Sequence, residues 1–415
     1  MNSHRISITA HATALLMIVA VGRVHEIIPA LSEIPIAKIA MIFCFLTLFF
    51  VRKNINEKVC VTGITKLMLF IFILAIVSVT FSVYKSESLN YVTTALLGTG
   101  LIVYLILKTI TGYNVLRYYI YIMIFCAAAL SYGVIAYGVV IQGEMGRVSV
   151  GETLDPNDLA LYLVTLLPLA LSQIFLVKTK YKIVLTGIIV LMLSAIMLTG
   201  SRGGYLGLLS IALFLLLQRY PQKDGHFSNV INVKKILLIA IGIFVLYHFV
   251  TAEYWSRFST IFNPQDDYNT HDERGRFAIW SAGLDLISKY PWGVGVAAFS
   301  SAQGSLEGGF YQTAHNSLIL VAAELGIAGF MLYITLYLKV IVKLGKIIRH
   351  EIIGISDEIK YTAIGLRAGL LGFFVSSFFL SQAYSPLLYV IYTLVDRAEY
   401  FFLRSVEANL SEKSD

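Results

Sequence analysis

Long apolar stretches separated by short polar connections recur along almost the whole chain. Each stretch runs for roughly 17–25 residues, the length of helix that crosses the hydrocarbon core of a bilayer. We count about twelve such spans from the hydropathy pattern. They lie near 7–22, 34–51, 64–83, 88–107, 117–141, 157–177, 182–199, 203–218, 233–252, 314–340, 359–381 and 384–403. The pattern predicts an all-α polytopic membrane protein in which residues 1–415 form a single integral membrane domain.

Composition agrees with this class and excludes an ordinary soluble domain. The chain is 57% hydrophobic and only 14% charged, which leaves too little polar surface for a soluble protein of this size. The net charge of +7 comes mostly from lysines and arginines in the connections that we assign to the cytoplasm. It therefore gives no reason to expect a nucleic-acid partner.

The lysines and arginines concentrate on alternate connections between the spans. Because cytoplasmic connections carry the excess of positive charge, both termini are predicted to lie in the cytoplasm. Residues 253–313, the long hydrophilic connection after the ninth span, then form an extracytoplasmic loop. The sequence thus predicts that any chemistry in water takes place on the outer side.

Several arginines are predicted to lie on or near the outer side. They are Arg147, Arg202, Arg257, Arg274 and Arg276. The planar guanidinium group donates two parallel hydrogen bonds to a phosphate, so arginines converging from separate loops would suit a diphosphate. The alternative is that each arginine only extends to the membrane interface from a helix end, and we favour this for Arg257.

The segment that follows Arg276 has the periodicity of an amphipathic helix. Phe277, Trp280 and Leu284 recur on one face, and Pro291 ends the pattern. This predicts a helix that rests on the membrane or on the bundle, with Arg276 in its first turn. The amide groups at a helix start also favour anions.

A His-Asn pair, His315 and Asn316, stands at the outer end of the tenth span, and Gly326 and Gly329 follow in the apolar run. We expect the glycines to let another helix approach closely and the histidine to lie at the membrane rim. A histidine near neutral pKa accepts a proton from a hydroxyl nucleophile. The alternative is an ordinary interfacial histidine.

Three further polar residues, Asp155, Glu324 and Arg367, have structural interpretations. Asp155 before Pro156 reads as a helix N-cap, with a catalytic carboxylate as the alternative. Glu324 and Arg367 lie within predicted spans, where unpaired charges are costly, so we expect an ion pair between them.

The long outer loop also carries a group of acidic residues. They are Asp266, Asp267, Asp272 and Glu273. Such carboxylates could bind a divalent metal, but a solvated acidic loop is the favoured interpretation. No metal-ligand spacing occurs in the sequence, so we predict neither a metal nor a cofactor.

Together these motifs resemble the O-antigen ligase and polymerase family. The resemblance rests on the pattern H-N-x(9)-G-x-x-G beginning at His315, on the segment Asp155-Pro156-Asn157-Asp158, on Thr199-Gly200-Ser201-Arg202-Gly203-Gly204, and on Gly275-Arg276 followed by Trp280 and Pro291-Trp292-Gly293-Val294-Gly295. It covers residues 145–330 in detail and the whole chain in topology.

The resemblance implies transfer of a glycan from undecaprenyl diphosphate to a hydroxyl acceptor, outside the bacterial inner membrane. Family ligases use a lipid A–core sugar as acceptor, polymerases use another lipid-linked repeat unit, and relatives modify proteins; no motif here distinguishes them. The implied partners are the lipid-linked donor, the acceptor and membrane lipids.

The same resemblance assigns roles to individual residues. Arg147, Arg202 and Arg276 match arginines proposed to hold the diphosphate, and His315 matches the proposed catalytic histidine. We place His315 and Arg276 in catalysis. We place Arg274 and Asn316 with Arg147 and Arg202 in substrate binding.

Two other classes of protein remain as alternatives. A multi-span transporter or flippase of lipid-linked glycans is expected to show internal repeats and helices broken at mid-depth, and no repeat is evident in the sequence. A non-catalytic scaffold would leave the candidate arginines and the histidine apart.

Overall fold

The computed structural model of this chain is almost entirely helical. It describes residues 6–27, 31, 34–50, 61–140, 147–150, 155–221, 227–228, 275–306, 309–350 and 357–411. The strands among these residues form two short antiparallel pairs, β1 (Val139–Val140) with β2 (Val148–Ser149) and β3 (Tyr220–Pro221) with β4 (Phe227–Ser228). The predicted all-α class is confirmed.

The helices occupy the predicted apolar stretches. The first part of the chain forms α1 (Ile8–Leu16), η1 (Met17–Val21), η2 (Val24–Ile27), α3 (Ile36–Phe50), α4 (Gly63–Phe81), α5 (Lys85–Tyr91), η4 (Val92–Leu96), α6 (Leu97–Thr109) and α7 (Tyr113–Tyr137). The second part forms α8 (Pro156–Gln173), α9 (Thr179–Leu198), α10 (Arg202–Leu217), α14 (Arg276–Lys289), α15 (Phe299–Gly304), α16 (Ser317–Arg349), α17 (Asp357–Ser377) and α18 (Pro386–Ser411). Each predicted span contains a helix except 233–252, which lies outside the described residues.

Length and composition mark part of this bundle as membrane-crossing. Within the described part of the chain, 5 helical segments are long and apolar enough to span a bilayer. They are Gly63–Phe81, Lys85–Thr109, Tyr113–Tyr137, Thr179–Leu198 and Ser317–Arg349. The chain is therefore a membrane protein, while the expected total of about twelve spans stays a prediction. The helix expected after Arg276 is confirmed as α14, which ends before Pro291.

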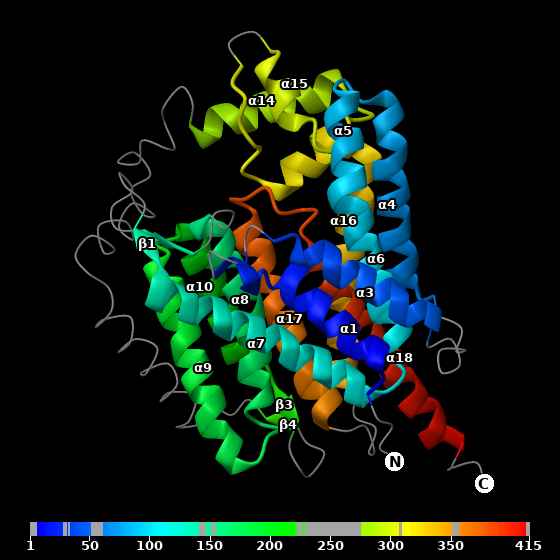
Figure 1. Ribbon diagram of the computed structural model, residues 1–415, viewed down its shortest axis with the longest axis vertical. Coiled ribbons are helices and arrows are strands. Elements are labelled where there is room, and N and C mark those ends of the chain that lie inside the picture. The colour runs from blue at the N-terminus through cyan, green and yellow to red at the C-terminus, as the bar shows by residue number, and fades with distance from the viewer. Residues whose placement is uncertain are drawn as a thin grey trace.

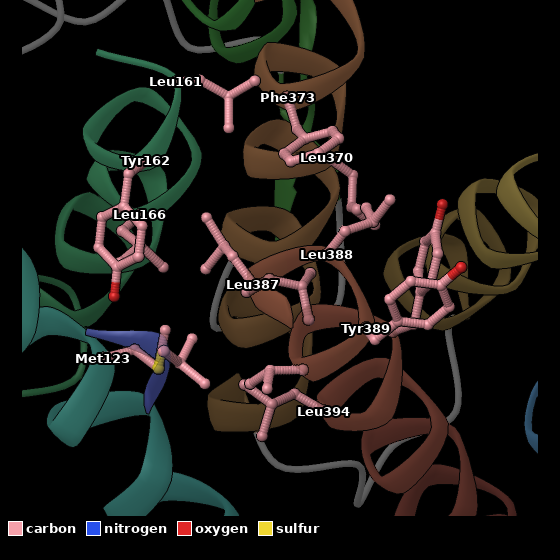
Figure 2. Close-up of a cluster of buried hydrophobic side chains, with 14 of the residues drawn as sticks. Met123, Leu161, Tyr162, Leu166, Leu370, Phe373, Leu387, Leu388, Tyr389 and Leu394 are labelled. Carbon is pink, nitrogen blue, oxygen red and sulfur yellow. The ribbon is translucent and has the colours of Figure 1, made fainter. Parts of the chain in front are cut away.

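The core lies where α8 meets α17 and α18. Leu161 and Leu166 of α8 point toward Phe373 of α17 and Leu387 of α18 across this interface (Figure 2). These side chains are almost fully buried, and α8 is covered on nearly every side. Because lipid tails are as apolar as these side chains, close packing and not removal from water holds the helices together here.

Small residues let the backbone of α17 come close to the backbones of α8 and α10. A Cβ atom added at Gly369 would lie 2.3 Å from the carbonyl oxygen of Thr165 in α8. Farther along α17, the Ser376 hydroxyl donates to the carbonyl oxygen of Gly203 in α10 at 3.0 Å. The first turn of α10, which carries Arg202, is thereby held against the end of α17.

Helix α16 is broken at Gly326, whose φ is +67° and ψ is −172°. Residues 291–295, which follow α14, pack into this break. The amide of Val294 donates to the carbonyl of Ala323 at 2.8 Å, and the amide of Ile327 donates to the carbonyl of Pro291 at 3.1 Å. A Cβ atom at Gly326 would lie 2.4 Å from that Pro291 oxygen, so glycine is needed both for the backbone angle and for space.

This break corrects the expected role of the two glycines in α16. The element that approaches Gly326 is the backbone of a loop and not another helix. A Cβ atom at Gly329 would meet the Leu325 side chain of its own helix at 2.2 Å, because the kink brings these turns together. The glycines therefore permit the bend in α16 and its contact with residues 291–295. The spacing of glycines along a predicted helix reveals neither feature.

The expected ion pair between Glu324 and Arg367 is wrong. The buried Glu324 carboxylate accepts a hydrogen bond from the amide of Phe299 at 3.2 Å, at the start of α15. Arg367 lies against Gly345, 3.3 Å from a Cβ added there. Gly345 follows Glu324 by 21 residues along α16, a rise of about 30 Å. The two charges thus lie at different depths, and Glu324 instead anchors the loop that fills the break.

The close approach of α8 and α17 gives a matched pair of substitutions. Gly369→Ala should lower the free energy of unfolding by about 1–3 kcal/mol, because the methyl group would collide with the Thr165 carbonyl. Gly187→Ala in α9 has open space around the new methyl group and should be neutral or slightly stabilising. Thermal unfolding of both variants in the same detergent tests this, and equal stability of the two would contradict the packing argument.

Candidate functional site

The candidate residues gather at one end of the bundle. Helices α14 and α15 lie together at that end, opposite the C-terminal part of α18 (Figure 1). Helix α16 begins beside α14 and α15 and carries His315 immediately before its first turn. The connection between α17 and α18, residues 378–385, reaches the same place, as its contacts with His315 and Arg276 establish.

His315 is held through its backbone, in a conformation that does not belong to the helix after it. Its φ is +44°, a left-handed conformation that costs a residue with a side chain about 1–3 kcal/mol unless the surroundings impose it. The His315 amide donates to the Ser381 hydroxyl at 2.9 Å. The imidazole Nε2 lies 3.4 Å from the Thr313 hydroxyl oxygen. The ring is half-buried, so it contacts both protein and solvent.

Asn316 is the N-cap of α16. Its side-chain oxygen accepts from the amide of Leu318 at 2.9 Å and from the amide of Ile319 at 3.1 Å. The residue is buried, with 2% of its surface exposed. The sequence predicts substrate binding for Asn316, but the hydrogen bonds give its side-chain oxygen a structural role. This oxygen caps the helix that begins directly after His315, and the cap so sets where the histidine lies.

Arg276 is the first residue of α14 and faces the same connection. Its guanidinium carbon lies 5.9 Å from the ring centre of Phe379. The charge of Arg276 also reaches His315. Burial and this nearby guanidinium lower the pKa of His315 below its ordinary value of 6.5, and the Asp155 carboxylate raises it in part. The imidazole is therefore poised to be neutral at physiological pH.

Arg202 and Arg147 meet at the turn before α10. Arg202 is the first residue of α10, where the Ser201 hydroxyl caps the helix by accepting from the amide of Gly204 at 3.2 Å. Arg147 is buried, and its Nε donates to the carbonyl of Thr199 at 3.0 Å. Two arginines far apart in sequence are thus brought to one turn, which Gly200 forms with a φ of +59°.

Phe379 links this turn to α14. A Cβ atom at Gly203, next to Arg202, would lie 3.6 Å from the Phe379 Cβ. On its other side Phe379 lies under Arg276 and beside Trp280 of α14, with ring centres 6.5 Å apart. The α17–α18 connection therefore stands between the two arginine-bearing helix starts and also holds His315.

Acidic residues of α8 complete the surroundings. Asp155 is the N-cap of α8, accepting from the amide of Asn157 at 2.7 Å, as its sequence predicts. One turn later Asp158 accepts from the Gln382 side-chain amide at 2.8 Å. His315 is thus subject to the opposite charges of Arg276 and Asp155.

Part of the predicted site lies outside the described residues, and part of the described site was not predicted. Arg257 and Arg274 fall outside, as do the acidic residues at 266–273. The α17–α18 connection, with Phe379, Ser381 and Gln382, was not singled out from the sequence. It carries no charge or glycine motif, so only its contacts reveal its position.

Comparison with known proteins agrees with the sequence motifs. Residues 187–334 match the family model described as O-Antigen ligase. The matched segment contains Arg202, Arg276 and His315, whereas Arg147 precedes it. A search among curated proteins finds no significant match to the chain. Residues 187–334 are therefore similar to the O-antigen ligase family, which confirms the resemblance of the chain to the O-antigen ligase and polymerase family.

Proposed function

We propose that this membrane protein transfers a glycan from undecaprenyl diphosphate to a hydroxyl acceptor at the periplasmic face of the bacterial inner membrane. The match of residues 187–334 to the O-antigen ligase family model supports glycan transfer in general. The observation that carries the specific proposal is the meeting of Arg202, Arg276 and His315 around one connection of the fold. Such an arrangement suits a dianionic leaving group next to a base.

The arginines would bind the diphosphate of the donor. Guanidinium groups form bidentate hydrogen bonds to phosphate oxygens, and pre-arranged donors of this kind stabilise charge that grows as a bond breaks. Arg147 donates to a carbonyl of the turn before α10, Arg202 begins α10, and Arg276 begins α14. In this proposal the arginines neutralise the leaving group, so no metal is assigned a role.

His315 would accept the proton of the acceptor hydroxyl. The acceptor oxygen forms a bond to the anomeric carbon, the bond from that carbon to the diphosphate oxygen breaks, and the hydroxyl proton passes to the neutral imidazole. Undecaprenyl diphosphate leaves with the electron pair. A single displacement of this kind inverts the anomeric configuration. The lowered pKa of His315 favours the neutral form that the step requires.

A flippase of lipid-linked glycans is the alternative, and one observation bears on it. Helices broken at mid-depth are typical of transporters, and α16 is broken at Gly326. The break, however, is filled by the backbone of residues 291–295. This filling supports a structural use of the break, and so it favours the transferase.

Substitutions at the proposed base and at the nearest arginine test the transferase. His315→Ala and Arg276→Ala should each lower the rate of glycan transfer from a purified lipid-linked donor by about 100-fold or more. His11→Ala in α1 and Arg404→Ala in α18, which change exposed residues of the same two types, should leave the rate unchanged. Folded His315→Ala and Arg276→Ala proteins with normal transfer would refute the assignment.

The pH dependence follows from the two opposite charges near the histidine. The transfer rate should rise with pH through a pKa below 6.5 and then stay level toward neutrality. Asp155→Asn removes an anion that favours the protonated ring, and should move the pKa of His315 lower; Asn still caps α8. Arg276→Gln should move it higher. Titration of His315 by NMR measures both shifts, and shifts in the reverse directions would contradict this electrostatic arrangement.

The acceptor is either lipid A–core or another lipid-linked repeat unit, and the surface glycans of a deletion strain distinguish the two. A ligase that uses lipid A–core predicts that all long glycan chains are lost from lipopolysaccharide. A polymerase predicts that only single repeat units remain attached. Gel profiles of the surface glycans distinguish these outcomes. An unchanged lipopolysaccharide with loss of a secreted polysaccharide would instead assign the protein to the synthesis of that secreted polysaccharide.

A further inference from the structure

The turn Leu380–Gln382, between α17 and α18, makes four hydrogen bonds to the residues around the proposed base. Its Ser381 hydroxyl accepts from the amide of His315 at 2.9 Å. The Ser317 hydroxyl donates to the carbonyl of Leu380 at 2.7 Å and accepts from the amide of Gln382 at 2.9 Å. The Gln382 side-chain amide donates to Asp158 of α8 at 2.8 Å. One turn thus joins the start of α16 to the start of α8.

The conformation of His315 requires such support. A φ of +44° is disfavoured for a residue with a side chain, so the surroundings must hold it. On one side of the residue Ser381 holds its amide, and on the other side Asn316 begins α16. Because these contacts act on the backbone, they set the direction in which the imidazole leaves the chain.

The bond from Gln382 to Asp158 holds the turn from the far side. Ser317 secures the turn to α16, and Asp158 secures it to α8, which is buried on nearly every side. The turn is therefore braced between two helices. A displacement of either contact would be passed to Ser381, and from there to the amide of His315.

We propose that Ser381 and Gln382 are positioning residues for His315, with Asp158 as the anchor that holds Gln382. This inference rests on the proposed function, because it assumes that the imidazole must be aimed at an acceptor hydroxyl. Neither residue supplies a charge to the reaction. Their effect is on the geometry of the base, where a misplacement of about 1 Å costs about 100-fold in rate.

Removal of the Ser381 hydroxyl is the first test. Ser381→Ala should lower kcat for transfer by about 10- to 100-fold and leave KM for the lipid-linked donor unchanged, because the arginines are untouched. The pKa of His315 should move toward its ordinary value as the ring leaves Arg276. Ser381→Thr keeps the hydroxyl and should keep the rate. Ser385→Ala makes the same change on the same connection, at a side chain without a hydrogen bond among the described residues, and should be neutral.

Substitution of Gln382 and of its hydrogen-bond partner Asp158 is the second test. Gln382→Glu removes the amide donor, places a second carboxyl group beside Asp158, and should lower kcat like Ser381→Ala. Addition of Asp158→Asn should restore most of the rate, because the asparagine amide then donates to the new carboxylate. A rescue of this kind reports a restored contact, and a general loss of folding cannot produce it.

The outcomes separate this inference from the proposed function. Wild-type kcat and an unchanged His315 titration in folded Ser381→Ala and Gln382→Glu proteins would overturn the positioning role. Equal losses in kcat, donor binding and thermal stability, without rescue, would show a merely structural role and overturn it too. Full activity of His315→Ala would instead overturn the proposed function. The NMR titration of His315 still reports the positioning in that case, since it needs no activity.

Discussion

The end of the bundle that carries the candidate site depends on a loop backbone that fills a broken helix. Backbone amides and carbonyls within a bilayer must find partners inside the protein, since lipid offers none. The break in α16 at Gly326 exposes such groups, and residues 291–295 supply their partners. The same loop binds the connection between α4 and α5, because the amide of Val83 donates to the carbonyl of Val294 at 2.9 Å. The loop therefore joins α16 to this connection through main-chain hydrogen bonds.

This junction relates the two proposed catalytic groups to each other. Arg276 begins α14, which leads directly into the loop, and His315 precedes α16, which the loop crosses. Glu324 secures the end of the loop by accepting from the amide of Phe299. The arginine and the histidine are thus connected through a short rigid path, although they belong to different helices. A carboxylate buried at this depth is used to hold main chain and not to balance a distant arginine.

The charges that act on His315 come from the starts of two other helices. Arg276 at the start of α14 lowers the pKa of the histidine, and Asp155 at the start of α8 partly opposes that change. In the proposed mechanism this setting keeps the imidazole neutral beside cations that would bind the anionic donor. The α17–α18 connection maintains the arrangement without contributing a charge.

The sequence by itself determined the membrane class, most helix positions and the chemical types at the site. Hydropathy and caps act locally, so α14 and the cap at Asp155 were recognisable from the sequence. The resemblance to the O-antigen ligase family was recognisable as well, and a family-model match over residues 187–334 confirms it. Only the tertiary structure decided which groups meet. The partner of Glu324, the loop against Gly326 and the contacts of Ser381 and Gln382 join residues distant in the chain. Such contacts depend on relative depth and on backbone bends, and neither of these leaves a periodic signal in the sequence.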